Sequence, residues 1–222
     1  AAERPAPCDG HRAPPPSHNA CRKADIARTR SVTPPRPDPA MVCLACRRWN
    51  ERTLWSTCRV GLREGPDRLL DLGLVRSGFV HEGAARKLVH RLKYEAITGA
   101  GRLLATEGMA HLLPHDAGAL VPVPRTRWRA VRYGVDPAAV LAHHLSALTG
   151  LPVVPVLRPA LYGRRHAGRV VSQRDVPVFG LTGPTPADAV LVDDVLTTGT
   201  TLEAAAATLG SVTAAITATV SV

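Results

Sequence analysis

The sequence predicts an α/β fold in which helices flank a mostly parallel β-sheet. Two observations predict it. Short apolar, β-branched runs alternate with segments of helical periodicity along most of the chain, as in repeated strand–helix–strand units. The run at residues 190–192 has no polar alternation, which is typical of a strand buried on both faces of a parallel sheet. The 222 residues, 45% of them apolar, suffice for one ordinary domain and a small appendage.

Each expected element has its own local signal. Strands are expected where apolar residues run together, at residues 74–80, 119–123, 153–157, 190–194 and 212–220. Helices are expected at residues 82–94, 101–113, 136–148 and 202–209. The first helix keeps the i, i+3, i+4, i+7 spacing of one buried face, with Ala85, Leu88, Val89 and Leu92. The boundaries of the others are marked by Pro114, Asp136-Pro137, Gly150 and Gly210.

The segment A-V-L-V-D-D-V-L-T-T-G-T-T-L, from Ala189 to Leu202, carries the clearest functional signal. A loop of small residues that opens a helix directs backbone N–H groups and the positive end of the helix dipole at one point, which suits a phosphate. This loop comprises Thr197, Thr198, Gly199, Thr200 and Thr201. The preceding Asp193 and Asp194 can accept hydrogen bonds from sugar hydroxyls. The segment therefore predicts a sugar-phosphate site.

Two other kinds of phosphate loop do not fit this segment. A Walker A loop needs a Lys after its last Gly, and none follows Gly199. The G-x-G-x-x-G fingerprint of dinucleotide-binding folds is absent here. The remaining alternative is an ordinary strand–turn–helix in which the Asp and Thr residues have no shared function.

The charge distribution favours an anionic ligand. The net charge is +10, and residues 121–175 hold nine Arg against two Asp. Such a field attracts pyrophosphate compounds or a nucleic-acid backbone, although a merely solvated basic surface is the alternative for any single Arg. No apolar run approaches the ~20 residues of a membrane span, and the N-terminus has no stretch of signal-peptide type. We therefore expect a cytoplasmic protein without a membrane span.

The N-terminal part differs in composition from the rest. Residues 1–40 hold nine of the twenty Pro and no aromatic residue, so we expect a disordered tail. One hypothesis is that Met41 is the natural start and that this tail is not native. Residues 41–66 contain Cys43, Cys46 and Cys58, whose C-x-x-C spacing suits zinc in a reducing compartment. Three ligands do not close a tetrahedral site, so either the tail supplies a fourth (Cys8, His11, His18 or Cys21) or the knuckle is metal-free.

The motif at residues 189–202 resembles the phosphoribosyl-pyrophosphate (PRPP) motif of type I phosphoribosyltransferases. Three further segments, L-V-H-R-L-K-Y (88–94), V-P-V-P-R-T-R-W-R-A-V-R-Y-G (121–134) and R-R-H-A-G-R-V-V-S-Q-R (164–174), occur in the order found in the ComF family of competence-associated proteins. The resemblance implies a type I phosphoribosyltransferase-like domain at residues 67–222, preceded by a degenerate Cys knuckle. ComF relatives carry a second C-x-x-C pair, and Trp55 stands at its first position here.

The resemblance also implies roles for individual residues. Asp193 and Asp194 would bind the ribose hydroxyls and stabilise an oxocarbenium-like C1, and residues 197–201 would bind the 5′-phosphate. Mg²⁺ would accompany the pyrophosphate, whose cradle would be Val123, Pro124, Arg125 and Thr126. A closing loop at residues 158–179 would bring Arg164 and Arg165 to the reacting centre.

Three functions are compatible with these features. The first is transfer of ribose 5-phosphate from PRPP to an unidentified acceptor. The second is a non-catalytic sensor of PRPP, and the third is a competence factor that binds single-stranded DNA or a DNA-uptake helicase. Direct DNA binding is weakened by the scarcity of aromatics, since only Trp128 and Tyr133 lie in the Arg-rich stretch. The sequence leaves the acceptor and the formation of a homodimer open.

Overall fold

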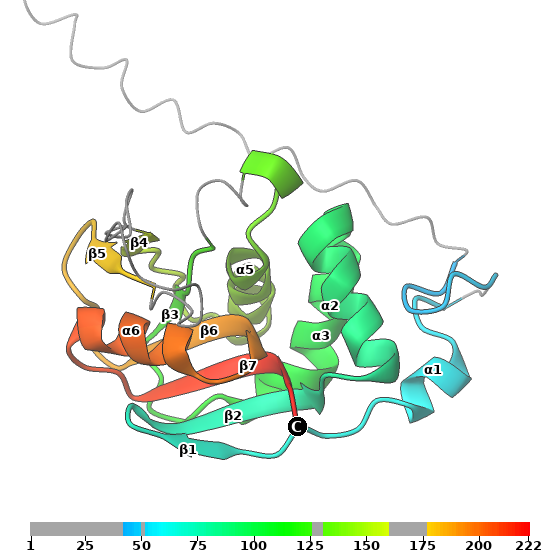
Figure 1. Ribbon diagram of the computed structural model, residues 1–222, viewed down its shortest axis with the longest axis horizontal. Coiled ribbons are helices and arrows are strands. Elements are labelled where there is room, and N and C mark those ends of the chain that lie inside the picture. Colours follow the sequence, from blue (N-terminus) through cyan, green and yellow to red (C-terminus); the bar gives the residue numbers. More distant parts are fainter. Residues whose placement is uncertain (1–41, 50–51, 126–130, 160–176) are drawn as a thin grey trace, which may run out of the picture. The chain divides into compact units, whose positions relative to one another are not determined.

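The computed structural model describes residues 42–49, 52–125, 131–159 and 177–222, all within one compact unit that spans Arg36–Val222 (Figure 1). The expected tail, residues 1–40, lies outside the described residues. Among the described helices, none has the length and apolar character needed to cross a lipid bilayer.

A five-stranded sheet forms the centre of the fold, in the order β1-β2-β7-β6-β3. Its strands are β1 (Arg68–Leu70), β2 (Gly73–Val80), β7 (Ala214–Val220), β6 (Ala189–Leu196) and β3 (Ala119–Pro122). The four strands from β2 to β3 are mutually parallel, and β1 joins the β2 edge antiparallel. The expectation of a mostly parallel sheet is therefore confirmed.

Helices cover both faces of this sheet (Figure 1). Side chains of a strand alternate between faces, so Val190 and Val192 pack with α2 (Gly83–Glu95), α3 (Thr98–Leu104) and α5 (Pro137–Thr149). Leu191 packs on the other face with α6 (Thr200–Leu209). The absence of polar alternation in β6 thus has the expected cause, since each face of the strand is buried under helices.

The helix expected at residues 101–113 is only partly correct. It begins earlier, as α3, and continues as a π-helical turn, η1 (Ala105–Met109), and a 3₁₀ turn, η2 (Ala110–Leu112). The π turn brings Gly108 against β2, where a Cβ on Gly108 would lie 2.4 Å from the Phe79 ring. A Cβ on the facing Gly78 would lie 2.7 Å from the Gly108 carbonyl oxygen. Helical periodicity does not report such a close backbone approach.

The strand expected at residues 153–157 is wrong in its extent. Val153 forms a single parallel bridge to Leu120, and the chain then leaves the central sheet. It continues as β4 (Leu157–Pro159), which pairs antiparallel with β5 (Phe179–Leu181) in a separate two-stranded sheet. Pro155 explains the break, because it has no N–H to donate to a ladder.

The Cys-containing segment packs onto the same core as the main sheet. It includes one short helix, α1 (Ser56–Val60). Cys43 and Leu54 are almost completely buried in the hydrophobic cluster that holds Leu88 and Leu92 of α2. The Cys-containing segment therefore packs directly against α2, and α2 ends at the candidate functional site.

Candidate functional site

Asp193 and Asp194 lie near the carboxyl end of β6, where consecutive side chains point to opposite faces of the sheet. Asp194 is buried at 8% exposure on the face of α2, and Asp193 is half-buried on the face of α6. The Asp194 N–H donates to Asp193 Oδ1 at 2.7 Å. Burial raises the pKa of Asp193 well above its usual range, and the neighbouring Asp194 carboxylate raises it further. The two adjacent carboxyl groups therefore have different surroundings.

Lys93 is the direct partner of Asp194, and sequence reasoning assigned it no role. It lies in the last turn of α2, and its Nζ is 2.9 Å from Asp194 Oδ1. Both side chains are mostly buried, with 21% and 11% exposure, so this ion pair is better shielded from solvent than a surface pair. Lys93 thereby holds the Asp194 carboxyl group in place from the end of α2.

Thr219 of the neighbouring strand β7 and His81, which follows β2, support the acid pair. Thr219 Oγ1 donates to the Asp194 carbonyl oxygen at 3.2 Å, and His81 Nδ1 lies 2.9 Å from that same hydroxyl. Burial lowers the pKa of His81, and the positive charges of Lys93 and Arg86 lower it further. His81 is therefore neutral at pH 7 and holds Thr219 in place without adding charge.

The predicted phosphate loop connects β6 to α6. Gly199 occupies the N-cap position of α6 with φ +90°, and the exposed Thr197 and Thr198 precede it. Thr198 Oγ1 lies 3.0 Å from Thr200 Oγ1, so both hydroxyls are at the start of the helix. The first N–H groups of an α-helix have no partner within the helix. The loop thus places hydroxyl groups and the first N–H groups of α6 together, and phosphate binding there stays a prediction.

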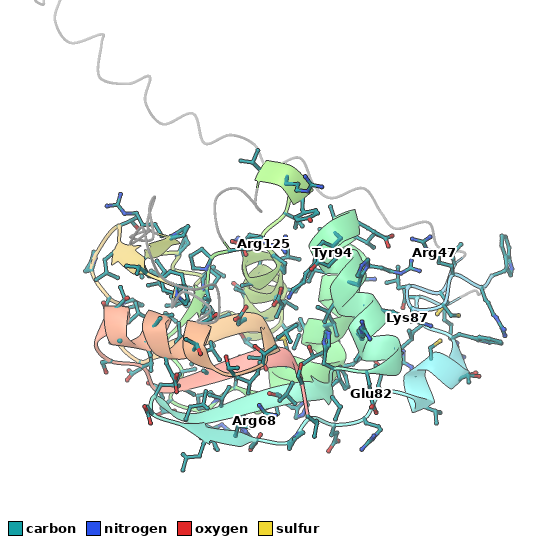
Figure 2. All side chains as sticks on the ribbon, viewed as in Figure 1. Arg47, Arg68, Glu82, Lys87, Tyr94 and Arg125 are labelled. Carbon is teal, nitrogen blue, oxygen red and sulfur yellow. The ribbon has the colours of Figure 1, made fainter. Side chains whose placement is uncertain are left out.

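Strand β1 contacts this loop through Arg68 and Leu70, and the sequence did not predict this contact. Arg68 Nη1 donates to the Thr197 carbonyl oxygen at 2.7 Å, and Arg68 Nη2 donates to the Ser221 carbonyl oxygen (Figure 2). Leu70 packs so closely on Gly199 that a Cβ there would lie 2.4 Å from Leu70 Cδ1. A strand of three residues gives too short a pattern to be detected from periodicity.

The predicted pyrophosphate cradle lies beside the acid pair because β3 and β6 are parallel neighbours. The Val123 N–H donates to the Val192 carbonyl oxygen at 2.9 Å, and Pro124 and Arg125 follow directly. Thr126 lies outside the described residues, as do Arg164 and Arg165 of the expected closing loop. The structure thus brings three of the four cradle residues to the edge where the acid pair lies.

A third carboxylate, that of Asp136, faces the cradle. Its Oδ2 accepts the Arg125 N–H at 3.3 Å, while its Oδ1 is buried without a hydrogen-bond partner. Burial raises the pKa of Asp136, the Arg125 N–H lowers it, and the Asp194 charge raises it. The sequence predicted Asp136 only as the residue that begins α5, a position that it occupies. Its carboxylate competes with any anion for the Arg125 N–H.

The Arg125 side chain is anchored to the protein rather than extended into solvent. Its Nη1 donates to the carbonyl oxygens of Lys93, at 3.0 Å, and Val135, at 3.2 Å. These two contacts tie the end of α2 to the segment that precedes α5. The guanidinium group is therefore held beside the end of α2 by the protein itself.

The three cysteines form a second candidate site. The sulfur atoms of Cys43, Cys46 and Cys58 all lie within 4.8 Å of one another, so this group could hold a metal such as zinc. Burial raises the pKa of Cys43, but hydrogen bonds from the N–H groups of Cys46, Trp55 and Ala45 and from the Cys46 thiol together lower it to about 7. Burial and the neighbouring sulfurs raise the pKa of Cys58 to about 12. A bound cation would reverse this rise, because metal binding favours the thiolate.

Trp55 contacts the cysteine cluster through its backbone. Its backbone N–H donates to Cys43 Sγ at 3.3 Å, and the Arg48 guanidinium lies 4.8 Å from its ring centroid. The tail residues that were expected to supply a fourth ligand, Cys8, His11, His18 and Cys21, lie outside the described residues.

The sequence matches no protein-family model, and no curated protein is significantly similar to it.

Proposed function

We propose that this chain is a ComF-type, phosphoribosyltransferase-like protein that binds PRPP and transfers its ribose 5-phosphate to an acceptor. The observation that carries the proposal is the position of Asp193 and Asp194 at the end of β6, directly before the helix-opening loop of residues 197–201. Acceptors for hydroxyls and donors for a phosphate thereby adjoin one another at the carboxyl edge of a parallel sheet, where ligands of α/β proteins bind.

Each group at this edge has a role in the proposed reaction. The N–H groups and hydroxyls of the loop bind the 5′-phosphate, and the two carboxylates accept hydrogen bonds from the ribose hydroxyls. Their fixed negative charge also stabilises positive charge that develops at C1 as the pyrophosphate leaves. Lys93 and Thr219 hold Asp194 in position, so its orientation is established before substrate binds.

Magnesium is expected to arrive with the pyrophosphate rather than at a dedicated protein site. The donors near the ribose position are the carboxylate oxygens of Asp193 and Asp194, which are of the hard type that Mg²⁺ prefers. When bound, the metal supplies neutralisation of the leaving group's charge. The zinc-type cysteine cluster belongs to a different part of the fold and takes no part in this step.

The alternative of a PRPP sensor is favoured by one observation. The Asp136 carboxylate accepts the Arg125 N–H that a pyrophosphate would need. If this contact persists when PRPP is bound, the ribose-phosphate half of the ligand is held while its leaving group lacks a donor. The two functions therefore differ in turnover rather than in binding.

Calorimetry with PRPP and Mg²⁺ tests the proposal. We expect the wild-type chain to bind, and Asp193→Asn combined with Asp194→Asn to reduce affinity at least 100-fold, because two charged hydrogen-bond acceptors are lost. Asp188→Asn is the control, since it removes one carboxylate from the exposed residue just before β6, at the opposite end of the strand. Absence of binding at millimolar PRPP, or an equal loss in the control, contradicts the proposal. Release of pyrophosphate with a panel of acceptors then separates enzyme from sensor.

A further inference from the structure

Arg68 connects the short edge strand β1 to the predicted phosphate loop. Its Nη1 donates to the Thr197 carbonyl oxygen at 2.7 Å, and its Nη2 donates to the Ser221 carbonyl oxygen. These two carbonyl groups directly follow β6 and β7, which are neighbours in the sheet. The Ser221 N–H donates in turn to the Leu196 carbonyl oxygen at 2.8 Å. One guanidinium group therefore bridges the two strand ends at the point where the loop begins.

The contact with Arg68 determines which way the peptide group between Thr197 and Thr198 faces. The peptide bond is trans, so its C=O and its N–H point in opposite directions. Because the Thr197 carbonyl oxygen points at Arg68, the Thr198 N–H points away from Arg68. Within the described part of the chain, this N–H has no hydrogen-bond acceptor. The Thr198 N–H is therefore available to a ligand and has a fixed direction.

The Thr198 N–H comes directly before a run of further donors. Gly199, with φ +90°, turns the chain into α6, and its carbonyl oxygen accepts from the Glu203 N–H at 3.0 Å. The N–H groups of residues 200–202 precede this intrahelical bond and have no partner within the helix. Successive N–H groups in such a turn form a concave site for an anion. A peptide group held by Arg68 adds one more donor to this set.

Arg68 also brings a positive charge to the loop. Its side chain is half-buried and donates to carbonyl groups, which carry no net charge. The adjacent Asp67 carboxylate pairs instead with Arg76 of β2, at 3.7 Å, and no described carboxylate forms an ion pair with Arg68. A cation in partial shelter from solvent attracts an anion more strongly than a fully solvated cation does.

We propose that Arg68 is a positioning residue for the 5′-phosphate of PRPP. It holds the peptide group of Thr197 and Thr198 so that the Thr198 N–H faces the phosphate, and its charge strengthens the binding of a phosphate dianion. The inference rests on the proposed function and adds to it a residue 129 positions away from the loop that it orients. Arg68 acts through the loop and does not itself touch the substrate.

Calorimetric titration of the full chain with ribose 5-phosphate tests the proposal. Arg68→Met keeps the apolar stem but removes the charge and both donors, so affinity should fall about tenfold. Arg68→Lys keeps the charge but cannot reach both carbonyl groups, so its affinity should be intermediate. Arg76→Met is the matched control, because Arg76 also donates to a backbone carbonyl, that of Leu112 at 3.1 Å, from the adjacent strand β2. Its affinity for ribose 5-phosphate should equal that of the wild type.

A second measurement separates the orientation of the peptide group from a general effect on folding. In the ¹⁵N-labelled wild type, saturating ribose 5-phosphate should shift the Thr198 amide resonance, because its N–H gains a charged acceptor. The shift should be restored in part by Arg68→Lys relative to Arg68→Met. A role of Arg68 that is only structural would leave the shift at saturation the same in all three proteins.

Unchanged affinity in Arg68→Met, or an equal loss in Arg76→Met, overturns the inference. A Thr198 resonance that does not move in the saturated wild type overturns it as well, and a lysine variant no better than the methionine variant removes the contribution of the charge. Each of these results leaves PRPP binding by the wild type intact. A wild type that binds PRPP but not ribose 5-phosphate overturns the inference alone, whereas binding of neither ligand overturns the proposed function too.

Discussion

Asp193 and Asp194 are adjacent in sequence, yet the alternation of a strand gives them different surroundings. Asp194 faces α2 and is paired with Lys93, whereas Asp193 has a carboxyl whose pKa is raised by burial and by Asp194. A carboxyl that must ionise in order to accept hydrogen bonds from a substrate costs stability while the site is empty. Under the proposed function, the acid pair therefore loses fold stability in order to bind its ligand, as functional sites often do.

Asp193→Asn should raise the thermal stability of the ligand-free protein at neutral pH. Because the pKa of Asp193 is higher in the folded state than in the unfolded state, the folded state binds a proton more tightly. Ionisation of this group therefore lowers stability as pH rises from the usual aspartate range through the folded-state pKa. The substitution removes that loss, and we expect Tm to rise by about 2–5 °C at pH 7–8 but not at pH 3–4.

Calorimetric or fluorescence-monitored melting across this pH range checks the prediction, with Asp188→Asn as the control. An unchanged or lower Tm at pH 8 would show that the Asp193 charge is well solvated or paired in the folded state. PRPP binding to the wild type should change in the opposite sense and strengthen as pH rises through the same pKa.

At the scale of elements, β1 and the start of α6 form one unit although 129 residues separate Arg68 from Thr197. Arg68 binds the carbonyl groups at the ends of β6 and β7, and Leu70 fills the space beside Gly199. The glycine is required for two independent reasons, its φ of +90° and the contact with Leu70.

Gly199→Ala should destabilise the protein by about 2–4 kcal/mol, which combines the left-handed backbone penalty with overpacking against Leu70. Adding Leu70→Ala removes the close contact but not the backbone strain. The double variant should therefore be less destabilised, relative to Leu70→Ala alone, than Gly199→Ala is relative to wild type. Urea denaturation of the four proteins measures this difference. Strictly additive effects would mean that the Leu70 contact is not what excludes a Cβ.

The elements also show where sequence patterns succeed and fail. The helix at residues 82–94 and the strand at 190–194 were predicted correctly. In each, the pattern of apolar residues is regular over most of the element, so only the terminal residues were uncertain. The strand at 153–157 was predicted too long because the apolar residues around Pro155 were given more weight than the proline itself. Strand β1 was missed because three residues are too few to show a periodic pattern. The π turn at Ala105–Met109 depends on Gly78 and Gly108 meeting, which no local pattern records.

At the scale of the whole molecule, the Cys cluster and the acid-pair site share α2. Cys43 is packed in the same hydrophobic cluster as Leu88 and Leu92, and the helix that carries these leucines ends at Lys93 and Tyr94. Any ligand that binds only the folded Cys cluster therefore stabilises the helix that positions the site.

Zinc should raise the Tm of the wild-type chain by about 5–10 °C when it is present well above its dissociation constant. A chelator should reverse the shift, and Cys58→Ser should abolish it by removing one of only three described sulfur ligands. Melting curves with zinc, with magnesium and with chelator measure the effect. A shift that persists in Cys58→Ser would place the metal elsewhere in the chain.

By itself the sequence determined the alternation of strands and helices, the acid pair before a helix-opening loop, and the spacing of the cysteines. These features depend on residues close together in the chain, where the periods of the helix and the strand act directly. Only the tertiary structure decided that Lys93 pairs with Asp194, that Asp136 accepts the Arg125 N–H, and that Tyr94 meets Tyr133. The physical reason is that such contacts follow from how helices pack on a sheet, and packing is set by the whole core rather than by any one segment.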